Sequence, residues 1–158
     1  MTITLEPIGM IRSPFTQQAG TPIQPRFADN VKATAVIEER YADGLYRLEG
    51  FERIWLLIWL DRAAPARLRL KPYRAEIECG VFATRAPSRP NSIGLSCVRL
   101  VRIEGTVLHL AEVDLLDGTP LLDIKPYSPR FDCYPDARDG WLAETDGASE
   151  SADDRFER

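Results

Sequence analysis

The sequence predicts a mainly β protein whose antiparallel strands form a closed or nearly closed β-barrel with a few short helical turns. Short apolar runs recur along the chain and are separated by glycine, proline and asparagine turn signals. Strands do not alternate with long helices, which disfavours a parallel sheet covered by helices. No GxGxxG sequence follows the first apolar run, so a dinucleotide-binding unit is not indicated.

Each element is expected from its local pattern. Residues 3–13 hold apolar residues on both sides of Pro7, which places this strand at an edge or breaks it. Residues 41–52 fit a short helix or turn that ends at Gly50, because Leu45 and Leu48 share one face. The glycine-containing turn at 104–106 makes its flanking strands a hairpin. The barrel should cover about residues 3–130, with further strands expected at 32–39, 53–61, 67–77, 80–84, 92–105, 106–118 and 120–132.

Length and charge predict one domain followed by an acidic tail. The chain has 158 residues and a formal net charge of −4. Residues 136–158 contain eight acidic and three basic residues, so the body at 1–135 carries about +1. The tail has few apolar anchors and is expected to be largely flexible. We expect residues from about Gly147 onward to be mobile and dispensable for folding.

Cysteine, histidine and hydropathy exclude several classes of protein. Three cysteines without a CxxC spacing argue against a disulfide framework and a thiolate zinc site. The single histidine, His109, is expected on the solvent face of a strand, and no metal is expected. The longest apolar run, residues 54–60, is too short to span a bilayer, and the N-terminus lacks the pattern of a signal peptide. A cytoplasmic protein with no membrane attachment is therefore expected.

The segment at 80–100, GVFATRAPSRPNSIGLSCVRL, contains three arginines and no acidic residue. Two prolines stiffen this arginine loop, and Asn91 and Gly94 tolerate positive φ angles that turn backbone amides toward a ligand. Arg85 and Arg89 on a stiff loop suit a carboxylate or phosphate group. The alternative is a solvated turn whose arginines have no specific role.

A second candidate is the sequence DIKPY near residue 125. Asp123, Lys125 and Tyr127 occupy alternate positions, so they should project to one face of an extended segment. That face could line a pocket, or the segment could be a structural turn. A third and weaker candidate is the pair of segments RSPF and GTPIQP, which contribute Arg12, Gln24 and Arg26.

Three ordered motifs, IGMIRSPF…GTPIQP, GVFATRAPSRPNSIGLSCVRL and DGTPLLDIKPY, resemble the TsaA-like family. The similarity covers about residues 6–135. It implies a β-barrel methyltransferase that uses S-adenosyl-L-methionine and forms a homodimer, with the cofactor near the dimer interface. The implied substrate is N6-threonylcarbamoyladenosine beside the tRNA anticodon, which receives a methyl group on N6.

The resemblance also implies roles for individual residues. Arg89 and Asn91 are expected on the substrate side, and Asp123, Lys125 and Tyr127 are candidates for catalysis. Ser92 stands where the family motif commonly has a second proline, so a somewhat looser loop is expected. The implied cofactor-binding residues are Pro25, Arg26, Phe27, Asp61, Arg62, Arg85, Leu95, Asp114, Leu115, Leu116 and Asp117.

Two other functions stay open. The protein could methylate a small molecule or another nucleoside with the same cofactor. It could also be a non-catalytic module that binds S-adenosylmethionine or RNA. The intact DIKPY and TRAPSRPN motifs favour catalysis over a degenerate module.

Overall fold

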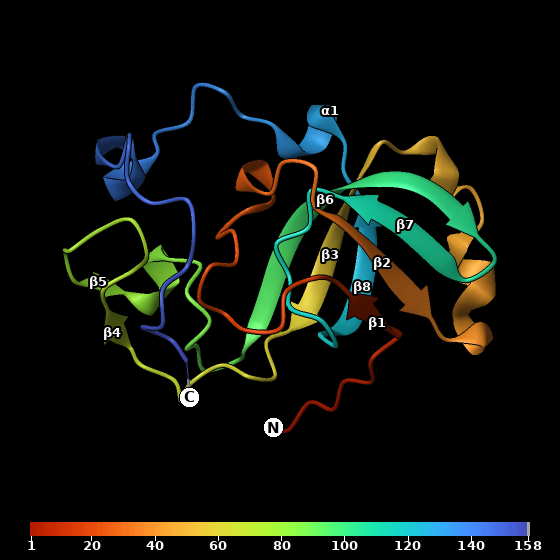
Figure 1. The fold of residues 1–158 in the computed structure, drawn as a ribbon, viewed down its shortest axis with the longest axis horizontal. Helices are drawn as coiled ribbons and strands as arrows, with labels where there is room; N and C mark the ends of the chain where they lie inside the picture. Colours follow the sequence, from red (N-terminus) through yellow and green to blue (C-terminus); the bar gives the residue numbers. More distant parts are fainter. Residues whose placement is uncertain (158) are drawn as a thin grey trace.

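The strands of the main sheet close into an antiparallel barrel in the order β1-β2-β7-β6-β3-β8 (Figure 1). This computed structural model describes residues 1–157. The closed barrel confirms the fold class expected from the turn signals. Its strands are β1 (Gly9–Arg12), β2 (Lys32–Ile37), β3 (Arg53–Trp59), β6 (Ile93–Glu104), β7 (Val107–Ala111) and β8 (Pro120–Pro126).

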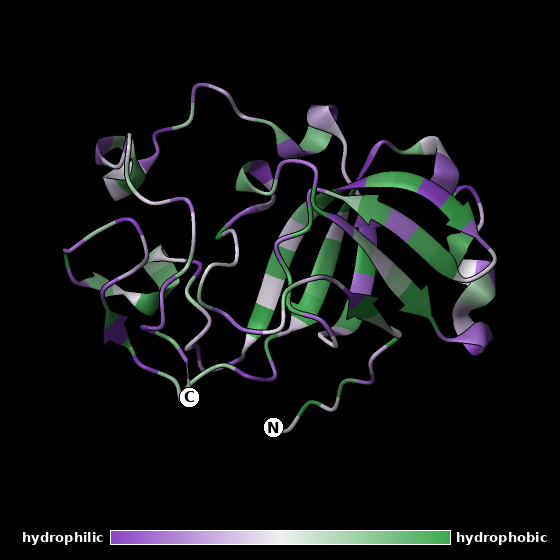
Figure 2. Cartoon of the chain, viewed as in Figure 1, coloured by the Kyte–Doolittle hydropathy of each residue, from purple (hydrophilic) through white to green (hydrophobic). Residues whose placement is uncertain are grey.

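The barrel interior is the main hydrophobic core. Along β3, Ile54, Leu56 and Ile58 are buried and alternate with less buried residues, and β3 pairs with both β6 and β8. Figure 2 shows the corresponding alternation of hydrophobic and hydrophilic residues along the barrel strands. Full burial of one such aliphatic side chain stabilises the fold by about 1.5–3 kcal/mol. The predicted hairpin is confirmed, because β6 and β7 pair in antiparallel register across the turn at Gly105.

A small lobe at residues 67–84 lies beside the barrel (Figure 1). The two strands expected in this lobe are shorter than predicted. At 67–77 only β4 (Arg69–Leu70) is extended, because Pro72 lacks an amide donor and Arg74 has a positive φ of 70°. At 80–84, β5 (Cys79–Gly80) gives way to the 3-10 helix η4 (Val81–Ala83). The amide of Thr84 donates to the Val81 carbonyl at 3.1 Å, which closes this turn.

Short helical turns connect the remaining elements, as expected. Residues 41–52 contain the end of one 3-10 helix and all of a second, and the second ends at Gly50. The helical turns are η1 (Pro25–Phe27), η2 (Glu39–Leu45), η3 (Leu48–Gly50), α1 (Pro129–Asp132) and η5 (Gly140–Glu144).

The strands expected at 106–118 and 120–132 are both shorter than predicted. The first strand ends at Ala111, because the chain leaves the sheet at Glu112, whose φ is 58°. The second ends at Pro126, and a helical turn, α1, follows it.

The C-terminal segment after α1 returns to the small lobe (Figure 1). The Trp141 indole donates to the Ala83 carbonyl at 2.8 Å, and Phe156 is only 1% exposed. Phe156 joins a second core cluster with Leu70, Val81 and Ala86. The flexibility expected of 136–158 stays a prediction, and these contacts oppose it; Arg158 lies outside the described residues. Within 1–157, no helix is long and apolar enough to cross a membrane.

Candidate functional site

A cavity of about 550 Å³ lies between one end of the barrel and the small lobe. Its walls come from the ends of β3 and β6, the loop at 16–24, the arginine loop, residues 114–119 and the C-terminal segment. Ile58, Leu60 and Leu116 supply apolar surface, while Asp114 and Arg85 supply opposite charges. The volume and the mixture of apolar wall with few polar groups are typical of small-molecule sites.

A hydrogen-bonded carboxylate marks the barrel side of the cavity. Asp114 follows β7 and is partly buried, and the Ser96 hydroxyl on β6 donates to its Oδ1 at 2.7 Å. Burial raises the pKa of Asp114 to about 6, while the Ser96 hydrogen bond and the Arg85 charge act in the opposite direction. Asp114 can therefore accept hydrogen bonds from ligand hydroxyl groups or attract a cation near neutral pH.

An arginine without an acidic partner faces this carboxylate across the site. Arg85 Nη1 donates to Gln24 Oε1 at 2.8 Å, so a neutral amide holds the guanidinium. No ion pair within residues 1–157 involves Arg85. The remaining guanidinium donors are suited to a carboxylate or phosphate of a ligand.

A second carboxylate lines the cavity just after β3. The Oδ1 atom of Asp61 is buried and has no hydrogen-bond donor among residues 1–157, although Arg62 Nε lies 3.6 Å away. Arg62 Nη2 donates instead to the Asp117 carbonyl at 2.8 Å. Buried carboxylate oxygens normally have a donor, so a ligand hydroxyl or amino group would satisfy Asp61.

Arg89 lines the cavity but also supports the loop that carries it. Its Nη1 atom donates to the carbonyls of Val81, Thr84 and Ala86 at 3.2, 2.8 and 3.2 Å. These bonds tie residues 81–86 to Arg89 within the arginine loop. The other residue expected on the substrate side, Asn91, does not line the cavity.

The structure brings only some of the expected cofactor-binding residues together. Those that line the cavity are Asp61, Arg62, Arg85, Leu95, Asp114, Leu115 and Leu116. The segment Pro25–Phe27 forms η1 directly after Gln24, and Phe27 packs under Arg74 at 4.9 Å rather than in the cavity. Asp117 accepts a hydrogen bond from the Ser13 amide at 3.1 Å and also lies outside the cavity.

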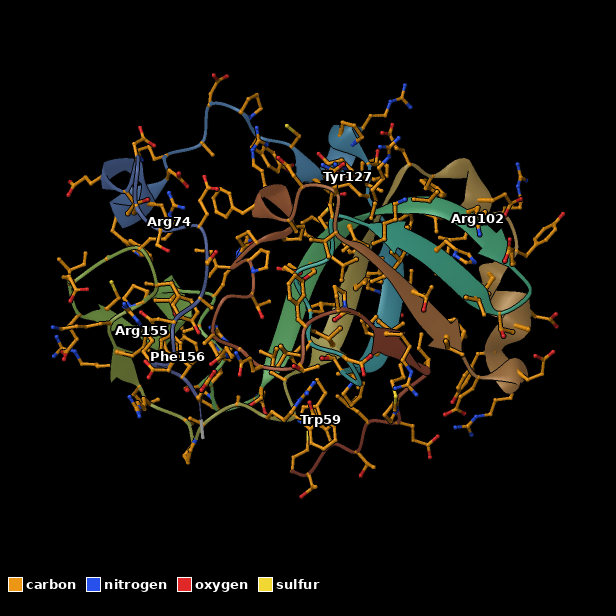
Figure 3. The ribbon with its side chains drawn as sticks, in the orientation of Figure 1. Trp59, Arg74, Arg102, Tyr127, Arg155 and Phe156 are labelled. Atoms are coloured by element: carbon orange, nitrogen blue, oxygen red, sulfur yellow. The ribbon has the colours of Figure 1, made fainter. Side chains whose placement is uncertain are left out.

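The three residues proposed for catalysis do not line the cavity of their own chain. Asp123 and Lys125 project from the outside of β8 and form an ion pair at 2.9 Å. The Tyr127 ring meets Trp55 edge-on, with centroids 5.9 Å apart. Figure 3 shows Tyr127 and Trp59 toward opposite ends of the barrel. One chain therefore does not bring this trio to Asp114.

Several cavity residues were missed by sequence reasoning. Ser96 is buried in β6 and lies inside the segment at 80–100 that the sequence singled out, but no local pattern marked it as a site residue. Tyr73, Ala152 and Glu157 line the cavity from the small lobe and the C-terminal segment. Gln24 was expected only as part of the weaker candidate in the GTPIQP segment. Within 1–157, no cluster of three or more His, Cys, Asp or Glu residues could hold a metal ion.

Comparison with known proteins identifies relatives of nearly the whole barrel. Residues 10–133 match the family model of the tRNA-methyltransferase O N-terminal domain. An S-adenosyl-L-methionine-binding protein of Archaeoglobus fulgidus is 46% identical over 129 residues, which cover 82% of this chain and 92% of the relative. A tRNA (adenine(37)-N6)-methyltransferase of Mus musculus is 37% identical over 134 residues, covering 80% of this chain and 31% of the relative.

A solved structure gives the same result for the fold. The crystal structure of TrmO from Pseudomonas aeruginosa superposes with a TM-score of 0.75 at 41% identity. The match covers 89% of this chain and 63% of the TrmO chain. The chain therefore spans somewhat less than two thirds of that solved relative.

Proposed function

Because the chain belongs to the tRNA-methyltransferase O N-terminal domain family, we propose that it is an S-adenosylmethionine-dependent tRNA methyltransferase. The proposed acceptor is N6 of threonylcarbamoyladenosine next to the anticodon. The observation that carries the proposal is the cavity in which Asp114, held by Ser96, faces an arginine without an acidic partner. The names of the archaeal and mouse relatives support the cofactor and the class of substrate.

The residues of the cavity fit the parts of S-adenosylmethionine. Asp114 and the unsatisfied Asp61 oxygen would accept hydrogen bonds from ribose hydroxyls or attract the cationic groups. Arg85 would bind the carboxylate of the methionine moiety, and apolar surface from Leu60 and Leu116 would cover the adenine ring. When bound, the sulfonium supplies an electrophilic methyl group. The chain's contribution is to orient cofactor and acceptor and to exclude water, since methyl transfer depends on alignment.

We propose a homodimer in which the outer face of β3 and β6 is covered by a second copy. This face exposes Trp59, Ile93 and Leu95, which are 49%, 43% and 45% exposed. Ile93 and Leu95 also line the cavity, so the apolar face adjoins the proposed cofactor site. A partner docked there could bring its own outer-face residues, Asp123 and Tyr127 among them, toward the cavity. In this arrangement Asp123 and Tyr127 would act at the cavity of the partner, although they lie outside the cavity of their own chain.

Methylation of defined tRNAs tests the proposed function. The purified protein is mixed with labelled S-adenosylmethionine and a tRNA that carries threonylcarbamoyladenosine, and the nucleosides are identified by mass spectrometry. We expect methylated threonylcarbamoyladenosine, and no product from the same tRNA lacking the threonylcarbamoyl group. Cytoplasmic tRNA is the proposed cellular pool. Cofactor binding without methylation of any tRNA would instead support the non-catalytic module, and methylation of free nucleosides would support a smaller substrate.

A further inference from the structure

The C-terminal residues 150–157, which we call the strap, form part of the cavity wall. Ala152 and Glu157 both line the cavity beside Tyr73. The family model ends at residue 133, so it assigns no role to this segment. The strap is therefore a feature of the site that the matched domain does not describe.

The strap pairs with the loop at 17–24, which lines the cavity beside it. Backbone bonds run in both directions between the two segments, and Pro22 and Ser151 form an antiparallel bridge. This pairing fixes the loop over several consecutive residues rather than at one point. The bonds are Gly20 N to Ala152 O at 2.8 Å, Ala152 N to Thr21 O at 2.7 Å, Ile23 N to Glu150 O at 3.1 Å and Ala19 N to Glu157 Oε1 at 2.9 Å.

A buried aromatic residue anchors the strap in the small lobe. Phe156 packs with Leu70, Val81 and Ala86, and it meets the Tyr73 ring edge-on with centroids 4.9 Å apart. Figure 3 shows Phe156 and its neighbour Arg155 beside β4 and β5. Since these apolar residues are buried only together, the anchor should hold the strap whenever the small lobe is folded.

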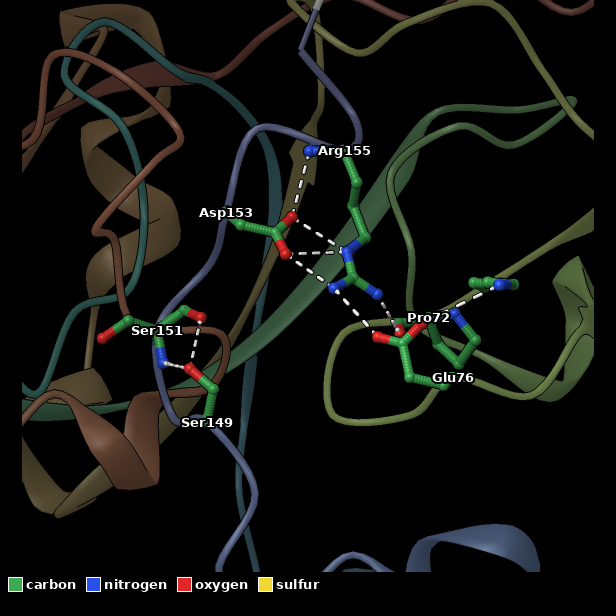
Figure 4. Close-up of polar contacts among 7 residues, drawn as sticks. Pro72, Glu76, Ser149, Ser151, Asp153 and Arg155 are labelled. Carbon is green, nitrogen blue, oxygen red and sulfur yellow. Dashed lines mark hydrogen bonds and ion pairs between the residues drawn. The ribbon is translucent and has the colours of Figure 1, made fainter.

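Arg155 adds a polar latch next to the anchor (Figure 4). Its guanidinium donates to both carboxylate oxygens of Asp153, and its Nη1 atom donates to the Pro72 carbonyl at 2.8 Å. It also lies 3.9 Å from a Glu76 oxygen and 5.6 Å from the Tyr73 ring centroid. The latch joins the strap to the β4–β5 connection, which fixes the strap's position relative to the cavity.

The loop held by the strap ends at Gln24, and Gln24 is the residue that holds Arg85. We propose that the strap positions Arg85 for ligand binding by fixing the 17–24 loop and, with it, the Gln24 side chain. This inference rests on the proposed function, because it assumes that the cavity binds S-adenosylmethionine. Gln24, Ala152 and Phe156 are thus positioning residues, whereas Arg85 contacts the ligand.

Two variants test the strap. Phe156→Ala removes the anchor, and Ala152→Pro removes the amide that donates to Thr21. We expect amide exchange at Gly20 and Ile23 in the ligand-free protein to become at least about tenfold faster, with β3 and β6 still protected. Affinity for S-adenosylmethionine, measured by calorimetry, should fall by about tenfold. Phe131→Ala, at a 77% exposed phenylalanine, is the matched control and should change neither quantity.

A double-mutant cycle tests the route through Gln24. Phe156→Ala should weaken cofactor binding much less in a Gln24→Ala background than in the wild type, because both changes release the same guanidinium. Additive effects, or faster loop exchange with unchanged affinity, would overturn the positioning role. Folded variants whose amides at 17–24 exchange at the wild-type rate would show that the strap does not hold this loop. A wild-type protein that does not bind the cofactor would refute the proposed function, while the ligand-free exchange would still decide the strap.

Discussion

The Ser96 hydroxyl on β6 donates a 2.7 Å hydrogen bond to the Asp114 carboxylate in the segment after β7. Ser96 is 3% exposed and points inward from a strand whose other inward residues include Val98 and Leu100. Burying a carboxylate at the end of an apolar core costs stability, and one hydrogen bond from Ser96 offsets only part of that cost.

The buried carboxylate should reduce stability above its pKa. Burial raises the pKa of Asp114 from 3.8 to about 6, so the favourable contribution of its protonated form is lost as pH rises through about 6. At pH 8, the free energy of unfolding of Asp114→Asn should therefore exceed that of the wild type by up to about 3 kcal/mol. The difference should shrink toward pH 4. Denaturant titrations at both values measure it, and Asp154→Asn at an exposed position is the control. An Asp114→Asn protein that is less stable at pH 8 would contradict the prediction.

Arg85 and Arg89, two of the three arginines within 1–157 that line the cavity, should respond differently to truncation. Arg85→Ala should weaken S-adenosylmethionine binding by about one to two decades, because a charge-assisted hydrogen bond is worth roughly 1.5–3 kcal/mol. It should leave the melting temperature nearly unchanged. Arg89→Ala should lower the melting temperature by several degrees, since the carbonyls of Val81, Thr84 and Ala86 lose the guanidinium donor that they share. Calorimetry and thermal unfolding of both variants check this contrast. Equal effects on affinity and stability would show that the arginines do not have separate roles.

Gly9 should be required for closing the barrel. A Cβ atom added to Gly9 would overlap the Val36 carbonyl oxygen on the paired strand β2. Backbone on both sides would have to move, so Gly9→Ala should lower the melting temperature by at least about 5 °C. Gly44→Ala is the matched control, because no atom lies within 4 Å of its added Cβ. Equal melting temperatures for the two variants would refute the packing argument.

The apolar outer face should hold two copies together. Trp59→Glu places a charge on the proposed interface and should convert a dimer to a monomer at micromolar concentration, as measured by light scattering. Tyr46→Glu, at an aromatic residue that is 85% exposed, should leave the dimer intact. A wild-type protein that is monomeric at this concentration would end the proposal of a homodimer.

Asp123 and Tyr127 should affect the rate rather than cofactor affinity. If a partner brings them to the acceptor, Asp123→Ala and Tyr127→Phe should lower single-turnover methylation by about 100- to 10,000-fold, the usual range for proton transfer groups. Cofactor binding should stay at the wild-type value, because neither residue lines the cavity of its own chain. Variants that stay folded and methylate at the wild-type rate would remove the catalytic assignment. Lower stability alone would assign the DIKPY segment a structural role.

The sequence by itself determined the barrel and several residues of its cavity. Alternating apolar residues and turn signals are local properties, so they predicted β2, β3 and the β6–β7 hairpin correctly. The arginine loop was also recognisable locally, because arginine spacing and proline content are visible in the chain itself. Arg85 lines the cavity, and its role in cofactor binding stays a prediction.

Tertiary structure alone decided what completes the site. Ser96 and Asp114 are 18 residues apart, and Gln24 and Arg85 are 61 residues apart, so no local pattern could pair them. The tail's composition predicts mobility because few apolar residues are available to offset the entropy of ordering. A prediction from the tail's composition leaves out the apolar site that Leu70, Val81 and Ala86 form only after folding. Phe156 is buried because it packs against these residues, which lie far from it in the sequence. The hydrophobic free energy depends on all the apolar surface that packing removes from water, and the tail alone does not contain that surface.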